Sequence, residues 1–171
     1  TGETPTEFMY DFEDGTLNGF LTLDVNGDGR TWGNSTQFSS TDCGYESPNC
    51  AVSRSYDGMY DLSPDDYMVT TRKYAITENS KLRFYAAAEN HLYAAEHYGV
   101  AISTTTNVSP SAFTTIWEET MIAKGNEVPR GERAPGQWYS KTVDLSAYAG
   151  QEVYIALRHF DCVDQFYINV D

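Results

Sequence analysis

Positive charge is scarce in this sequence. Its 171 residues include 11 Lys and Arg against 25 Asp and Glu, which gives a formal net charge of −14. Proteins that bind nucleic acid neutralise phosphates with clustered cations, so this balance excludes nucleic acid as an expected partner. The excess of acids has two explanations at this stage: a soluble acidic surface, or carboxylates that hold cations.

Long apolar runs are also missing. No stretch approaches the roughly 20 apolar residues that a membrane-spanning helix requires, so we expect no membrane span. The polar start, Thr1 to Pro5, has none of the features of a secretory signal or transit segment. We interpret the chain as a mature or excised fragment, an interpretation that leaves its compartment open.

Cysteines are few. Cys43, Cys50 and Cys162 allow three single disulfide pairings with one thiol left over, and free thiols in a reducing compartment are the alternative. There is no C-x-x-C pair, so a structural zinc knuckle is not expected.

Aromatic residues are plentiful by contrast, with 13 Tyr, 8 Phe and 3 Trp. An acidic disordered chain would be poor in aromatics, so disorder is excluded as the main state. The length is sufficient for one hydrophobic core. We therefore expect a single domain over residues 1–171.

Short runs of β-branched and aromatic residues predict strands, separated by turn residues. Residues 82–86, 98–103, 138–143 and 153–158 are such runs, and in the last of them Val153, Ile155 and Leu157 share one face. This alternation is typical of a half-buried strand. Residues 113–120 fit a short helix or a strand. Together the pattern predicts an all-β protein, an antiparallel sandwich or jelly roll.

The sharpest local motif is Asp24-Val25-Asn26-Gly27-Asp28-Gly29-Arg30. Oxygen ligands at alternating positions followed by glycine resemble the first half of a Ca²⁺ loop, in which Asp24, Asn26 and Asp28 converge and the Arg30 carbonyl adds another oxygen. Ser35 stands where an EF-hand has Glu, so we expect a loop on a β scaffold, completed by remote carboxylates. The alternative is a double turn without metal.

The remote candidates lie near the two chain ends. Asp11 and Glu13 are two residues apart, which on a strand gives them one face, and Asp171 follows the alternating residues 166–170. First and last strands often neighbour each other in a sandwich, so we expect these carboxylates to meet. For Asp11 and Glu13 alone, a solvated acidic turn is the competing interpretation.

No catalytic constellation passes a spacing test. The run from His91 to His97 contains neither H-E-x-x-H nor H-x-x-E-H, and Glu118 and Glu119 are adjacent, so on a strand they face opposite ways. His159 and Cys162 could form a base–nucleophile pair, although packing roles are favoured. We therefore expect no enzyme.

Several aromatics could instead form a flat platform for sugars, although most are expected to fill the core. These candidates are Tyr85, Tyr93, Tyr98, Trp117, Trp138 and Tyr139.

Longer stretches carry a family resemblance. They are LTLDVNGDGRTW after Phe12-Glu13, SPDDYMVT, YAAEHYGVAIST, FTTIWEET, RGERAPGQWYSKTVDL and ALRHFDCVDQFYINVD. From about residue 8 onward the chain resembles, collinearly, the cleaved-adhesin domains of gingipain proteases and hemagglutinins of oral Bacteroidetes. The stretch DCGYESPNC has no counterpart that we recognise, and Asn26 replaces a more usual Asp.

The resemblance implies a jelly-roll sandwich with structural Ca²⁺, displayed outside the cell as a non-catalytic adhesin. Its ligands would fall on Asp11, Glu13, Asp24, Asn26, Asp28, the Arg30 carbonyl and Asp171, with Glu46, Ser47 and Asn90 as weaker candidates. Expected partners are host-surface or extracellular-matrix proteins, haem proteins or glycans, and the expected location is secreted or cell-surface. A last strand truncated at Asp171 is also implied. The alternative function is a carbohydrate-binding module of a secreted hydrolase.

Overall fold

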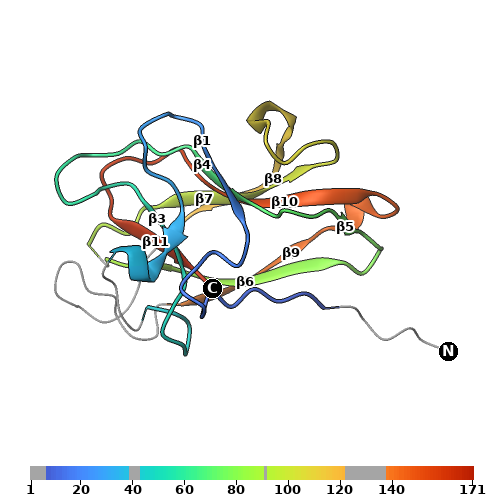
Figure 1. Ribbon diagram of the computed structural model, residues 1–171, viewed down its shortest axis with the longest axis horizontal. Helices are drawn as coiled ribbons and strands as arrows, with labels where there is room; N and C mark the ends of the chain where they lie inside the picture. Colours follow the sequence, from blue (N-terminus) through green and yellow to red (C-terminus); the bar gives the residue numbers. More distant parts are fainter. Residues whose placement is uncertain (1–6, 39–42, 91, 122–137) are drawn as a thin grey trace.

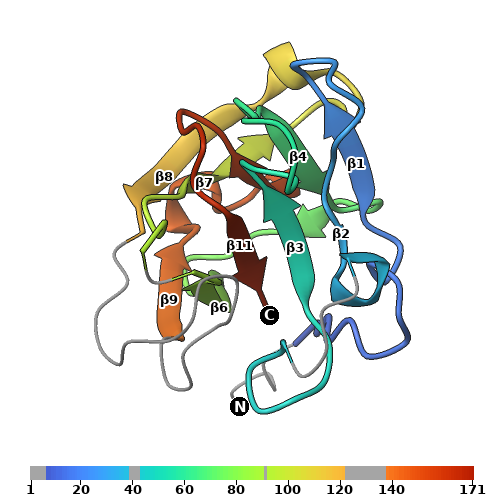
Figure 2. The same cartoon turned by 90° about the vertical axis from the view of Figure 1, so that its left-hand side faces the viewer.

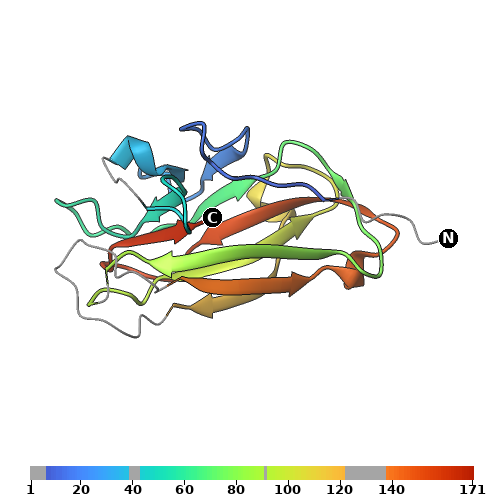
Figure 3. The same cartoon turned by 90° about the horizontal axis from the view of Figure 1, so that it is seen from below.

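Two antiparallel β-sheets face each other in the computed structural model, which describes residues 7–38, 43–90, 92–121 and 138–171 (Figure 1). The polar start at residues 1–5, His91, and residues 130–137 of the stretch RGERAPGQWYSKTVDL lie outside the described residues. Figure 2 views the two layers from one end, and Figure 3 shows β6 and β9 side by side along one face.

The first sheet has the strand order β1-β4-β10-β7-β8, and β5 also pairs with β10. Its strands are β1 (Leu21–Asp24), β4 (Asp66–Val69), β5 (Tyr74–Ala75), β7 (His97–Ser103), β8 (Thr114–Thr120) and β10 (Glu152–His159). The ambiguous residues 113–120 thus form a strand, which pairs with β7 with a register shift between Val100 and Ala101.

The second sheet has the order β2-β3-β11-β6-β9. Its strands are β2 (Gly33–Asn34), β3 (Ala51–Arg54), β6 (Lys81–Ala88), β9 (Tyr139–Asp144) and β11 (Tyr167–Val170). The short 3-10 helices are η1 (Ser35–Phe38), η2 (Pro110–Ala112) and η3 (Ser146–Tyr148). Among the described residues, no helix has the length and apolar character needed to cross a membrane.

The apolar core fills the space between the sheets. Val153, Ile155 and Leu157 of β10 point into it together with Ile168 and Val170 of β11. Ala156 of β10 belongs to a second apolar group, on the other side of its sheet. The predicted all-β jelly-roll sandwich of antiparallel strands, and the predicted alternation along residues 153–158, are therefore confirmed.

Two expectations about the chain ends are wrong. β1 lies in the first sheet and β11 in the second, so the first and last strands are not neighbours. Residues 11–13 form no strand: Phe12 has φ 60° and is buried, and Glu13 opens a turn. The burial of Phe12 anchors this turn against the core, and this anchoring positions the two acids without any strand.

Gly99 shows how tightly β7 is packed between its neighbours. A Cβ at this position would lie 2.4 Å from the carbonyl oxygen of Trp117 on β8. Because backbone cannot move aside cheaply, we expect Gly99→Ala to lower the free energy of unfolding by about 1–3 kcal/mol in urea titrations. Ser140→Ala, at an exposed position of β9, is the control and should change it by less than about 0.5 kcal/mol. Equal midpoints for the two variants would contradict this close packing.

Candidate metal centres

The loop after β1 is wrapped around the carboxylate of Asp24. Its Oδ1 accepts hydrogen bonds from the backbone N–H groups of Gly27 (2.9 Å) and Asp28 (3.3 Å), and its Oδ2 accepts one from Gly29 (2.7 Å). Gly27 and Gly29 have φ of 71° and 77°, a left-handed conformation that glycine adopts at little cost. The sequence D-V-N-G-D-G therefore folds as the predicted tight loop.

A third carboxylate joins this loop from the neighbouring strand. Asp66 is the register partner of Asp24 in the β1–β4 pair and is 1% exposed. Ligand atoms of Asp24, Asp28 and Asp66 all lie within 4.8 Å of one another. We call these three residues the Asp66 cluster.

The Asp66 cluster is electrostatically unfavourable without a cation. Burial, followed by the charges of Asp28, Asp24 and Asp65, raises the pKa of Asp66 from 3.8 to about 8. Asp28 Oδ2 and Asp66 Oδ1 are buried and have no hydrogen-bond partner among the described residues. Hard oxygen donors with free lone pairs in one small volume are what Ca²⁺ prefers, so these residues fit that ion.

The side chains of the other two residues predicted as ligands in the loop make contacts outside the cluster. The Asn26 side-chain amide donates to the Ser63 carbonyl (2.9 Å) and so ties the loop to the segment that leads into β4. The Arg30 guanidinium pairs with Asp57 (2.6 Å), while its backbone N–H donates to Asp28 Oδ1 (2.8 Å). Both residues thus brace the loop, and their roles as ligands remain predictions.

A second acidic group lies around the C-terminal residue. Asp171 Oδ2 accepts hydrogen bonds from the Tyr45 N–H (2.8 Å) and the Ser47 hydroxyl (3.0 Å). Burial raises the pKa of Asp171, the two hydrogen bonds oppose this shift, and the carboxylates of Glu13 and Asp11 add to it. The structure therefore brings Asp11, Glu13 and Asp171, here called the Asp171 cluster, into electrostatic contact.

The predicted ligands thus divide between two places. Asp24 and Asp28 lie with Asp66 in the first sheet and its loop, whereas Asp171 follows the last residue of β11 in the second sheet. Of the weaker candidates, Ser47 donates its hydroxyl hydrogen bond to Asp171, whereas Asn90 Oδ1 accepts a hydrogen bond from the Leu92 N–H (2.9 Å). Glu46 is exposed and has φ 51°.

Asp66 was not among the predicted ligands. In the sequence, Asp66 follows Asp65, and this acidic pair lies between the turn residues Ser63-Pro64 and the strand residue Tyr67. Nothing local distinguishes the two acids. The alternation of side chains along β4 distinguishes them only when the face that packs against the core is known. Asp66 then faces inward with Met68, whereas Asp65 pairs with Arg158 at 2.8 Å.

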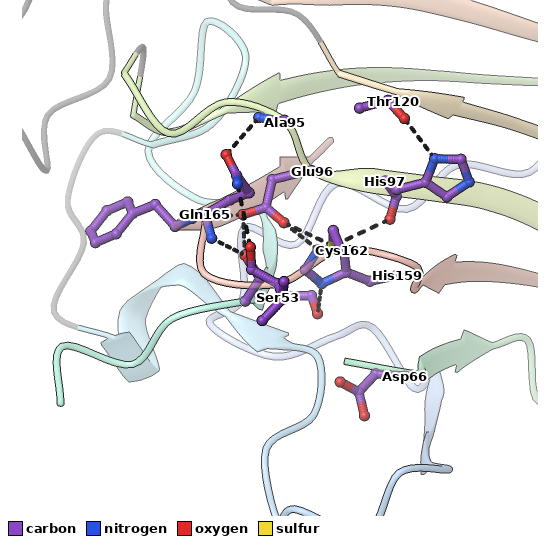
Figure 4. A network of polar contacts seen from close by, with 12 residues as sticks. Ser53, Asp66, Ala95, Glu96, His97, Thr120, His159, Cys162 and Gln165 are labelled. Carbon is purple, nitrogen blue, oxygen red and sulfur yellow. Dashed lines mark hydrogen bonds and ion pairs between the residues drawn. The ribbon is translucent and has the colours of Figure 1, made fainter. Parts of the chain in front are cut away.

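The histidine and cysteine suspected as a base–nucleophile pair do lie together, with Cys162 Sγ 3.3 Å from His159 Nε2. The same imidazole nitrogen lies 2.5 Å from Glu96 Oε2 (Figure 4). Burial and the Glu96 charge raise the pKa of the Cys162 thiol. A protonated thiol is a poor nucleophile, so this group does not support covalent catalysis.

The aromatic candidates separate into core and surface. Tyr98 is fully buried, and Trp117 packs edge-on against it and against Phe84. On the outer side of the second sheet, Tyr45 stacks on Tyr85 with ring centroids 3.7 Å apart, and Trp138 meets Tyr45 edge-on at 6.2 Å. Tyr45 was absent from the predicted platform because it lies in the segment 43–50, which follows no strand pattern.

Known proteins match both this sequence and this fold. The family model described as Cleaved Adhesin Domain matches residues 6–171. Hemagglutinin A of Porphyromonas gingivalis is 36% identical over 171 residues, which cover 94% of this chain and 8% of that protein. The chain therefore spans less than a tenth of that relative's length.

Solved structures of the same family have a similar fold. The K3 cleaved adhesin domain of Lys-gingipain from Porphyromonas gingivalis superposes with a TM-score of 0.77 and 37% identity, covering 95% of this chain and 93% of that one. A structure of carbohydrate-binding modules from the β-sandwich superfamily has a TM-score of 0.55 and 15% identity, covers 95% of this chain and 58% of that one, and shows likeness of fold alone. The resemblance inferred from the sequence is confirmed: the chain belongs to the cleaved adhesin domain family.

Proposed function

We propose that this domain is a non-catalytic, calcium-stabilised adhesin module, secreted or held at the cell surface, that binds host-surface or extracellular-matrix proteins. The observation that carries the calcium part is the Asp66 cluster, in which two buried carboxylate oxygens have no hydrogen-bond partner in the part of the chain that the structure describes. Family membership supports the adhesin part.

Calcium would act here as a structural ion. Asp24, Asp28 and Asp66 would hold one ion, with Asn26 and the Arg30 carbonyl as further predicted ligands, and Asp11, Glu13 and Asp171 would hold another. A bound cation replaces repulsion among buried carboxylates with coordination. The loops that bear these acids would then become rigid.

The loop held by Asp24 belongs to a group of three loops at one end of the sandwich. Arg30 joins it to the turn at residues 57–61 through Asp57. That turn meets the loop at residues 161–165, where the charge of Asp164 raises the pKa of Asp61. These three loops, here called the loop end, display exposed apolar side chains: Val25, Met59, Tyr60 and Val163. Binding surfaces are commonly built on such rigidly supported loops.

Calcium removal should destabilise the chain. We expect EDTA to lower the melting temperature by at least several degrees, about 1 kcal/mol or more for a domain of this size. Asp28→Asn should reproduce the part of that loss that comes from the ion of the Asp66 cluster, and should reduce the EDTA effect by the same amount. Glu78→Gln, at an exposed turn position, removes the same charge and should melt like the parent with and without Ca²⁺. An EDTA-insensitive melt in a chain without bound metal would refute the calcium proposal.

The metal-free chain should also lose stability as pH rises. The folded pKa of Asp66 (about 8) exceeds its ordinary value of 3.8, so the folded state holds a proton that the unfolded chain releases, and the free energy of unfolding falls between those two pH values. Asp66→Asn mimics the protonated acid and should remove this part of the slope. Urea titrations in EDTA across that pH interval measure it. Parallel stability–pH curves for the parent and Asp66→Asn would contradict the raised pKa.

A carbohydrate-binding module is the second candidate, and the group Tyr45, Tyr85 and Trp138 favours it. Sugars stack on flat aromatic rings, and these three rings gather at one place on the outer face of the second sheet.

The two candidates use different surfaces, so one pair of variants separates them. We expect Tyr60→Ala at the loop end to reduce binding to immobilised matrix proteins and erythrocyte membranes several-fold, and Tyr45→Ala to leave it unchanged. Loss of signal on a glycan array with Tyr45→Ala, but not with Tyr60→Ala, would instead support sugar binding. Failure of the parent to bind any of these probes in Ca²⁺ would refute the adhesin proposal.

A further inference from the structure

Three metal-type donor atoms from three segments meet inside one end of the sandwich (Figure 4). Glu96 directly precedes β7, His159 ends β10, and Cys162 lies in the loop after β10. Cys162 Sγ lies 3.3 Å from His159 Nε2 and 3.5 Å from Glu96 Oε2, and the latter two atoms are 2.5 Å apart. This group, here called the Cys162 site, contains one sulfur, one nitrogen and one oxygen donor.

The remaining polar atoms of these side chains are already engaged. His159 Nδ1 lies 2.7 Å from the Ser53 hydroxyl oxygen. Glu96 Oε1 accepts hydrogen bonds from the Ser55 hydroxyl (2.6 Å) and the Phe166 N–H (2.8 Å). These contacts fix the rotation of both side chains, so that Nε2 and Oε2 are the atoms turned toward the sulfur. Such outer contacts are what metal-ligating histidines and carboxylates normally have.

The sulfur has more polar neighbours than a single thiol proton can serve. Among the described residues, Cys162 Sγ lies 3.3 Å from His159 Nε2, 3.5 Å from Glu96 Oε2 and 3.9 Å from the His97 carbonyl oxygen. Glu96 and His159 are 0% exposed, whereas Cys162 is partly exposed. Cys162 is therefore the one of the three residues that solvent reaches, and an ion would enter from its side.

We propose that Glu96 Oε2, His159 Nε2 and Cys162 Sγ bind a divalent transition-metal ion of the Zn²⁺ class. One thiolate, one neutral imidazole and one carboxylate balance the two positive charges, and this mixed donor set suits zinc rather than calcium. On binding, the thiol proton leaves to solvent, and the proton between His159 Nε2 and Glu96 Oε2 exchanges away through solvent. The neutral imidazole then carries its one proton on Nδ1, which donates to Ser53 Oγ. A water molecule can occupy the fourth position on the exposed side.

The site is distinct in chemistry from the adjacent Asp66 cluster. Asp66 is the register partner of His159, so the two groups lie on neighbouring strands. The Asp66 cluster has only carboxylate oxygens, whereas the Cys162 site has sulfur and nitrogen. A thiolate ligand therefore gives a spectroscopic signal that carboxylates cannot imitate.

The test is a Co²⁺ titration of the metal-free full chain in saturating Ca²⁺ with a phosphine reductant. We expect a thiolate-to-cobalt charge-transfer band in the near ultraviolet that saturates at one ion per chain and disappears when Zn²⁺ displaces the cobalt. Cys162→Ser should abolish the band, and Cys43→Ser, the cysteine control in a different packing group, should keep it.

Ser53→Ala tests the positioning role of Ser53. It should retain the band but weaken the metal affinity about 10- to 100-fold, an effect that a merely structural role would not produce. Asp28→Asn should leave the Co²⁺ titration unchanged, which separates this proposal from calcium binding.

The parent titration decides the outcome without depending on any variant. A folded, fully reduced parent chain that develops no charge-transfer band at millimolar Co²⁺ would show that the group is a hydrogen-bonded network only and would overturn the proposal. A band that survives Cys162→Ser would also overturn it.

Discussion

The placement of Asp66 is the constraint on which one end of this molecule depends. In the first sheet it pairs with Asp24 of β1 on one side and with His159 of β10 on the other, and all three side chains belong to the inward face. Its carbonyl accepts a hydrogen bond from the Trp32 indole (3.0 Å), which fixes the link between β1 and β2. A buried carboxylate at this position is costly unless a proton or a cation neutralises it. The register of β1, β4 and β10 therefore decides where charge must be balanced.

The two ends of the core are held in different ways. Along most of its length, apolar side chains from both sheets pack together, and burial of that surface is the main stabilising term. At the His159 end, polar contacts cross between the sheets: Ser53 of β3 lies against His159 of β10, and the Phe166 N–H, just before β11, donates to Glu96. Such a network is stabilising only if every member is satisfied. Loss of one partner there should cost more than the single hydrogen bond that is removed.

Local patterns in the sequence were enough for the fold class and for two of the three acids of the Asp66 cluster. Alternation over residues 153–158 predicted β10, and the spacing of Asp24, Asn26 and Asp28 predicted a tight acidic loop, because both features depend on neighbours only a few residues apart. Asp66 and Glu96 were missed for the opposite reason. Each of these residues meets its partners because segments far apart in the sequence pair as strands. The periodicity of one strand does not indicate which other strand pairs with it. The expectation that first and last strands pair was wrong for the same reason.

Contacts with neighbouring segments hold two loops of the loop end to the frame formed by the two sheets. The loop at residues 24–30 is braced by Asn26 to Ser63 and by Arg30 to Asp57, and the loop at residues 161–165 is braced by Cys162 and by the Gln165 N–H, which donates to Ser55. The side chains of Val25 and Val163 in these loops are exposed and take no part in the anchoring hydrogen bonds. Substitutions at such exposed positions leave the anchors intact. The physical basis of the frame is therefore separate from the chemistry of whatever the loops bind, and a shared fold does not fix a shared partner.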